Sequence, residues 1–121
     1  MPKPRILLTR RWPKEAETKL FGAFDVTSDP KDRPITQETL IDALGSHDGL
    51  ACTVSDQIDA AVIRKSAPCR CKIIANFGVG TNHIDIKVAQ ESGIIVTNTP
   101  DVLTDATADL ALTLILMVSR R

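Results

Sequence analysis

Short apolar runs alternate along the chain with longer segments in which apolar residues recur every three to four positions. The short runs have the composition of β-strands and lie at residues 5–9, 24–27, 49–53, 72–76 and 94–97. The segments with helical spacing lie at residues 13–22, 36–45, 55–66 and 83–92. Strands that alternate with helices in this way predict a parallel sheet covered by helices on both faces.

The ends of these segments carry residues that start and stop helices. Thr36 can cap the second helix, Asp56 or Ser55 can cap the third, and Gly93 follows the fourth. Five short strands joined by right-handed crossovers predict a flavodoxin-like, doubly wound five-stranded parallel sheet. We therefore expect an α/β fold in three layers (αβα), with strand order 2-1-3-4-5, formed by residues 1–100.

A strongly apolar segment occupies residues 101–121. From Asp105 to Arg121 it predicts a helix, with an acidic residue at its start and two arginines at its end to suit the helix dipole. Its apolar stretch, 110–118, is far shorter than the roughly 20 residues of a membrane span. An exposed helix of this kind promotes aggregation, so we expect it to fold back over the sheet or to be buried on a second copy, in a homodimer or a domain swap.

Composition excludes several function classes. The 121 residues suit one domain, and 43% hydrophobic with 25% charged residues is typical of a globular protein. Fifteen basic residues balance fifteen acidic ones. The chain therefore has no net positive charge that would attract nucleic acid or an acidic membrane surface. The apolar run behind the N-terminus is too short for a signal peptide, and we expect a cytoplasmic protein.

The cysteines and histidines offer little chemistry. Cys52, Cys69 and Cys71 are odd in number and lack partners at the spacing of a zinc site, which predicts reduced thiols and no metal. His47 and His83 have no evident orienting partner in the sequence. We therefore expect both to have ordinary surface or helix-capping roles.

Ligands of a doubly wound sheet bind outside the carboxyl ends of its strands. Three loops there carry informative residues, at 9–12, 52–56 and 76–82. In the last of them, Gly78 and Gly80 allow backbone conformations closed to other residues, and they leave main-chain amides open to a ligand beside the start of a helix. Such a turn can hold a carboxylate, or it can be no more than a tight strand-to-helix connection. Neither a Gly-x-Gly-x-x-Gly pattern nor a P-loop occurs in the chain.

The first loop admits two interpretations. Arg10 and Arg11, beside Trp12, can reach an anionic ligand from the end of the first strand, whereas the plainer interpretation is a solvated loop. A receiver domain would need clustered acids at this place and a lysine after the fifth strand. The chain has arginines at the first place and Asn98-Thr99-Pro100 at the second, which excludes that class.

Three motifs in the second half of the chain resemble one family. They are Asn-Phe-Gly-Val-Gly-Thr-Asn-His-Ile-Asp at 76–85, Asn-Thr-Pro at 98–100 and Asp-Val-Leu-Thr-Asp-Ala-Thr-Ala-Asp-Leu-Ala at 101–111. Together they resemble the D-isomer-specific 2-hydroxyacid dehydrogenases, in particular the glyoxylate and hydroxypyruvate reductase branch. The resemblance extends over the chain from Ile6 onward.

The resemblance implies roles for individual residues. In the turn at Gly78, the main-chain amides of Val79 and Gly80 are expected to contact the substrate carboxylate, together with groups at Val54 and Ser55. The resemblance also implies that Thr107 lies near the nicotinamide end of a cofactor and that residues 98–100 cross toward a nucleotide-binding lobe. Asn82 departs from the acidic residue of many relatives, so no role is carried over to it.

The activity implied by the resemblance is hydride transfer between NAD or NADP and a small 2-keto or 2-hydroxy acid. The arginine, histidine and carboxylate of that chemistry lie downstream of Arg121 in the family. We therefore expect an isolated substrate-binding lobe with no catalytic residue of its own, inactive alone and binding no cofactor alone. The alternative is a stand-alone flavodoxin-like binding or interaction module without catalysis.

Overall fold

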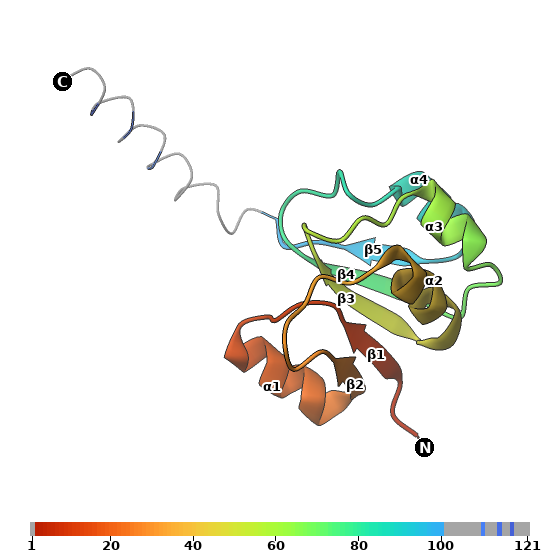
Figure 1. Ribbon diagram of the computed structural model, residues 1–121, viewed down its shortest axis with the longest axis horizontal. Coiled ribbons are helices and arrows are strands. Elements are labelled where there is room, and N and C mark those ends of the chain that lie inside the picture. Colours follow the sequence, from red (N-terminus) through yellow and green to blue (C-terminus); the bar gives the residue numbers. More distant parts are fainter. Residues whose placement is uncertain (1, 101–109, 111–113, 115–116, 118–121) are drawn as a thin grey trace.

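The computed structural model describes residues 2–100 together with Leu110, Leu114 and Met117. Strands and helices alternate along it, as the sequence predicts (Figure 1). The strands are β1 (Arg5–Leu8), β2 (Asp25–Ser28), β3 (Gly49–Thr53), β4 (Ile73–Phe77) and β5 (Ile95–Thr97). The helices are α1 (Lys14–Ala23), α2 (Gln37–Ser46), α3 (Ala60–Lys65) and α4 (Ile86–Glu91). Thr107, and the helix expected at 105–121 apart from the three residues named, lie outside the described residues.

The five strands form one sheet in the order β2-β1-β3-β4-β5, which confirms the predicted topology. Each neighbouring pair is parallel. In the centre of the sheet Leu7 lies beside Leu50, and Leu50 lies beside Ile74. Because the strands are parallel, the carboxyl ends of β1, β3 and β4 share one edge of the sheet, and the three loops singled out by the sequence leave from that edge.

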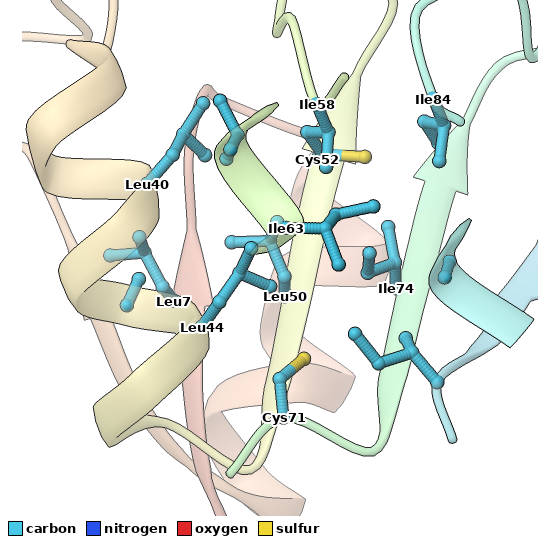
Figure 2. Packing of buried hydrophobic residues seen from close by; sticks show 14 of the residues in the cluster. Leu7, Leu40, Leu44, Leu50, Cys52, Ile58, Ile63, Cys71, Ile74 and Ile84 are labelled. Atoms are coloured by element: carbon cyan, nitrogen blue, oxygen red, sulfur yellow. The ribbon is translucent and has the colours of Figure 1, made fainter. Parts of the chain in front are cut away.

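The larger part of the core lies between the sheet and helices α2, α3 and α4 (Figures 1 and 2). Leu44 and Ile63 from the helices meet Leu50 and Ile74 from the central strands, and all four are buried. A side chain of this size contributes about 1.5–3 kcal/mol when it is removed from water. This half of the molecule therefore provides a rigid support for the ends of β3 and β4.

The opposite face of the sheet is covered by α1 over β1 and β2 (Figure 1). Ile6 and Leu8 are buried there against Leu20 of α1. Farther along the same sheet, Ile73 of β4 and Ile95 of β5 are exposed. Within the part of the chain that the structure describes, the cover on this face thus ends before β5.

Two helix starts differ from the sequence prediction. Thr36 caps α2 as expected, because its hydroxyl accepts a hydrogen bond from the Thr39 amide at 3.2 Å. Helix α3 begins at Ala60 and is capped by Asp59, so the prediction of a cap at Ser55 or Asp56 is wrong. Helix α4 begins at Ile86 after a cap by Asp85, instead of at residue 83. In both places the expected first helical turn is absent. Ile58 and Ile84 instead form an isolated parallel β-bridge with each other.

All three cysteines lie among the described residues. Cys52 and Cys71 are buried free thiols, and Cys69 is a half-buried free thiol. Among residues 2–100 and the three described positions beyond, no group of three or more His, Cys, Asp or Glu side chains is placed to hold a metal ion. No helix in that same portion is long and apolar enough to cross a membrane.

Candidate functional site

The three loops at the carboxyl edge of the sheet touch one another. The first and second are joined by the Thr9 hydroxyl, which donates to the buried carboxylate of Asp56. The first also meets the third through Trp12 and Phe77, whose ring centroids lie 5.7 Å apart. The three loops therefore form one surface, built on the carboxyl ends of β1, β3 and β4.

The second and third loops approach each other at Gly78. A Cβ atom on Gly78 would lie 2.8 Å from Cγ1 of Val54, closer than side chains normally come. Gly78 is therefore required for close approach. Gly80 has open space where a Cβ would stand. Neither glycine has a positive φ, so the turn does not use the left-handed conformations that glycine allows.

The carbonyl groups of Gly78, Val79 and Gly80 all accept hydrogen bonds from the protein. The side-chain amide of Asn76 donates to the carbonyl of Gly78 at 3.3 Å and to that of Gly80 at 2.9 Å. The carbonyl of Val79 accepts from Nδ2 of Asn98 at 3.0 Å. The Gly78 carbonyl also accepts from the backbone amide of Thr99 at 3.0 Å. The Asn-Thr-Pro segment thus holds the glycine turn from behind.

This arrangement fixes the direction of the amides. In a planar trans peptide the N–H points opposite to the C=O of the preceding residue. With the carbonyls of Gly78 and Val79 turned inward, the N–H groups of Val79 and Gly80 point away from Asn76 and Asn98. Within residues 2–100 these two amides donate to no protein acceptor. Consecutive amides of this kind form a concave site for an anion.

The predicted contribution of a helix start to this site is wrong. Helix α4 begins at Ile86, six residues after Gly80. Partial charge at a helix end falls off within the first turn, so it adds little at Val79 and Gly80. The attraction for an anion comes from the two amides themselves.

The second loop is held by Asp56, for which the sequence predicts a place in a strand-end loop and a possible role as a helix cap. Its carboxylate accepts from the Thr53 amide at 2.9 Å as well as from Thr9. The hydroxyls of Thr53 and Ser55 lie 2.8 Å apart. Val54 and Ser55 are exposed at the tip of this loop, beside the glycine turn. The site residues predicted there are thus brought together with Gly78, Val79 and Gly80.

His83 differs from the expectation of an ordinary surface or capping residue. It is half-buried, and its Nε2 lies 2.9 Å from Oδ1 of Asn76. Burial lowers the pKa of His83, against a weaker opposing effect of the Asp56 charge. His47 is the C-cap residue of α2, and helix capping was one of the roles expected for it. Burial lowers the pKa of His47 as well. It lies before β3, at the other edge of the sheet.

The arginines of the first loop are engaged in ion pairs. Nε of Arg10 lies 2.9 Å from a carboxylate oxygen of Asp32, and Arg11 bonds both carboxylate oxygens of Glu17 at 2.9 Å. The Trp12 amide donates to Glu17 at 2.8 Å. These pairs order the loop and set a carboxylate against each guanidinium, so the interpretation of Arg10 and Arg11 as ligand-binding residues receives no support.

Sequence similarity agrees with this geometry. Residues 6–113 match the family model described as D-isomer specific 2-hydroxyacid dehydrogenase, catalytic domain. The chain belongs to the D-isomer specific 2-hydroxyacid dehydrogenase family. Over 119 residues it is 43% identical to the glyoxylate reductase of Thermococcus kodakarensis, and over 118 residues 42% identical to that of Pyrococcus horikoshii. Each match covers 98% of this chain but only 35% of the relative.

Two solved structures share the fold. A putative D-isomer specific 2-hydroxyacid dehydrogenase, NAD-binding, from Polaromonas sp. JS6 66 has a TM-score of 0.80 and 36% identity. The match covers 95% of this chain and 36% of that one. The TT0316 protein of Thermus thermophilus gives a TM-score of 0.79 at 39% identity, over 97% and 37% of the two chains. The chain therefore spans about a third of the length of the proteins that it matches.

Proposed function

We propose that this chain is the substrate-binding lobe of an NAD(P)-dependent D-2-hydroxyacid dehydrogenase of the glyoxylate or hydroxypyruvate reductase type. The observation that carries the proposal is the pair of outward-facing amides at Val79 and Gly80. They offer two donors to the carboxylate that every 2-keto and 2-hydroxy acid possesses. The names of the similar proteins, glyoxylate reductases, support a small substrate.

Val54 and Ser55 complete the proposed site. The contact between Val54 and Gly78 brings the loop tip beside the two amides, and the Ser55 hydroxyl supplies a further polar group there. The site is open surface, because Val54 is 60% and Val79 is 41% exposed. A small carboxylate is therefore held by few contacts, and its full enclosure requires further residues of the longer protein.

The redox step belongs outside the described residues. A nicotinamide cofactor, when bound, supplies the hydride that reduces the 2-keto group. The present residues do not fit such a cofactor, because the chain has no Gly-x-Gly-x-x-Gly turn. Their contribution is to bind and orient the carboxylate. We propose that Thr107 lies near the nicotinamide in the longer protein, and that the 121 residues alone bind no NAD or NADP and reduce no keto acid.

The proposal is tested by comparing an acid with its neutral amide. Two hydrogen bonds to a charged acceptor, each about 1.5–3 kcal/mol, correspond to a dissociation constant on the order of 1 mM. In saturation-transfer NMR we expect the purified chain to give a signal on the methyl group of pyruvate and none on that of pyruvamide. Equal signals from both compounds would contradict binding through the carboxylate.

The same preparation tests the proposed lack of activity. We expect no oxidation of NADH or NADPH with glyoxylate or hydroxypyruvate above the rate without protein. Turnover at an enzyme-like rate, about 1 per second or more, would contradict the assignment as a binding lobe alone.

We also propose that segment 105–121 is buried, on this domain or on a second copy. Leu110, Leu114 and Met117 are spaced along one face of a helix and are exposed, as are Ile73 and Ile95 on the open part of the sheet. Light scattering distinguishes a monomer from a dimer, and amide exchange reports on 105–121. A monomer without protection in this segment would contradict both arrangements.

We propose a cytoplasmic location. The free thiols of Cys52, Cys69 and Cys71 support it, because reduced cysteines are usual in that compartment. Fractionation of cells that produce the protein would test the proposal, and recovery with secreted material would contradict it.

A further inference from the structure

Asn76, at the end of β4, has a complete set of hydrogen-bond partners although it is only 2% exposed. Its Nδ2 donates to the carbonyls of Gly78 and Gly80. Its Oδ1 lies 2.9 Å from Nε2 of His83 and 3.6 Å from Sγ of Cys52. A side-chain amide has two donor hydrogens and one acceptor oxygen with two lone pairs, so all its capacity is used.

These contacts fix the orientation of the Asn76 amide and the tautomer of His83. Two carbonyl oxygens can only accept, so the NH₂ group must face Gly78 and Gly80. The oxygen then faces His83, whose Nε2 must carry the proton. Burial lowers the pKa of His83, which keeps the ring neutral at pH 7 with Nδ1 unprotonated. Burial also raises the pKa of Cys52 to about 12, so that its thiol remains an S–H donor.

The Asn76 amide controls which groups of the glycine turn face solvent. The turn has no regular secondary structure, and Gly80 has no neighbour within 4 Å of a Cβ position. Side-chain packing at Gly80 therefore does not hold the turn. Nδ2 of Asn76 holds the Gly78 carbonyl at 3.3 Å, whose peptide plane carries the Val79 N–H, and the Gly80 carbonyl at 2.9 Å, whose plane carries the Thr81 N–H. The plane between these two carries the Gly80 N–H, and its Val79 carbonyl is held by Asn98. Without that bond, rotation of the peptide planes would point carbonyl oxygens at a bound anion and repel it.

We propose that Asn76, itself oriented by His83, is the positioning residue that keeps the Val79 amide directed at the substrate carboxylate, and that steadies the Gly80 amide by holding the peptide planes on either side of it. The proposal rests on the proposed function of those amides. It assigns to His83 the role of fixing the Asn76 amide, and no proton transfer to substrate.

The first test needs no ligand. Long-range ¹H–¹⁵N NMR of the histidine rings reports which nitrogen of His83 carries the proton. We expect the Nε2–H tautomer at pH 7, with the Nε2 proton slow to exchange. The Nδ1–H tautomer would overturn the proposal, because the lone pair of Nε2 would then face the Asn76 oxygen and His83 could not fix the orientation of the amide.

The second test compares two identical substitutions on one turn. Asn76→Asp replaces the donor facing the Gly80 carbonyl with an oxygen, whereas Asn82→Asp adds the same charge at an exposed residue that contacts neither carbonyl. With ¹⁵N-labelled chain and oxamate, we expect Asn76→Asp to weaken binding at least tenfold, about 1.4 kcal/mol. Asn82→Asp should change affinity by less than threefold. Equal losses would show an effect of charge alone and would overturn the proposal.

A third comparison keeps the proposal testable if Asn76→Asp fails to fold. His83→Gln retains a donor for the Asn76 oxygen, whereas His83→Leu does not. We expect His83→Gln to keep oxamate affinity within threefold and His83→Leu to lose roughly tenfold, about the value of one hydrogen bond. Equal behaviour of the two variants would overturn the proposal.

Failure of the proposed function is distinguishable from failure of this inference. If the wild-type chain binds no oxamate, the proposed function fails. The positioning role is then decided by the tautomer and by the ligand-free spectra. In those spectra His83→Leu should shift the Val79 and Gly80 amide resonances more than His83→Gln does, and the absence of such a difference would overturn it.

Discussion

A methyl group at position 78 would collide with Val54. The Cβ built on Gly78 lies 2.8 Å from Cγ1 of Val54, whereas ordinary contacts begin at 3.4 Å. Gly78→Ala therefore forces a displacement of about 0.6 Å or a rotation of the valine. Since φ of Gly78 is not positive, the backbone itself accepts alanine, and the whole effect falls on the contact between the two loops.

The size of the effect follows from what can move. Val54 is 60% exposed, so its side chain can leave its preferred rotamer at a cost of about 0.5–1.5 kcal/mol. We expect Gly78→Ala to lower the free energy of unfolding by about 1 kcal/mol. Because the displaced loop carries Val54 and Ser55, affinity for a carboxylate should also fall.

Urea unfolding of four proteins measures this effect: wild type, Gly78→Ala, Val54→Ala and the double variant. The double variant removes Cγ1 of Val54, so it should be more stable than the sum of the two single losses predicts. Gly80→Ala is the matched control, because a Cβ there meets nothing within 4 Å, and it should change stability by less than about 0.5 kcal/mol. Additive losses in the double variant would show that Gly78→Ala does not act through a collision with Val54.

Three further changes should alter stability in defined directions. Gly93 has φ +77°, so Gly93→Ala should cost about 1–2 kcal/mol in urea unfolding. The pKa of Glu17 is lowered mainly by its hydrogen bond from Arg11. The ionised Glu17 carboxylate therefore stabilises the folded state above its ordinary pKa of 4.5, and this stabilisation is lost as pH falls through the lowered pKa. Glu17→Gln should make the free energy of unfolding less dependent on pH in the acid range. The pKa values of His47 and His83 are lowered by burial, so the unfolded chain binds more protons below about pH 6.5. Unfolding midpoints should fall between pH 7 and 5, less so in His47→Gln, and a flat curve would contradict this.

The sheet was predictable because its signals are local. Each strand is a short apolar run bounded by turn residues, and five such strands with right-handed crossovers in a chain of this size fit the flavodoxin-like order 2-1-3-4-5. The cap at Thr36 could be assigned for the same reason, since its hydroxyl bonds an amide only three residues away.

The prediction of helix starts failed where a residue far away in the sequence bonds the side chain that was expected to cap the helix. Asp56 has a side chain suited to cap a helix, but its carboxylate is occupied by Thr9, 47 residues away, and by the amide of Thr53. The cap role therefore passes to Asp59. No periodicity or motif reveals that contact, because it depends on β1 and β3 being neighbours in the sheet.

The sequence singled out the glycine turn, but not the residues that orient its peptide groups. The glycines identified the turn, yet the atoms that direct its amides belong to Asn76, Asn98 and Thr99. The pairing of Asn76 with His83 joins a strand end to a residue seven positions later in an irregular loop. Its only sequence signal was the Asn-x₆-His spacing inside the glycine motif, which has no meaning until the path of the loop is known.

The central claim is that the Val79 and Gly80 amides receive a carboxylate. The most direct test is a ¹H–¹⁵N spectrum of the labelled chain during a titration with oxamate. We expect the Val79 and Gly80 amide protons to move downfield, and their shift changes to saturate with one dissociation constant, on the order of 1 mM. The Thr99 amide, already bonded to the Gly78 carbonyl, should move much less. Saturating shift changes at other residues, with the Val79 and Gly80 resonances unchanged, would contradict carboxylate binding by these two amides.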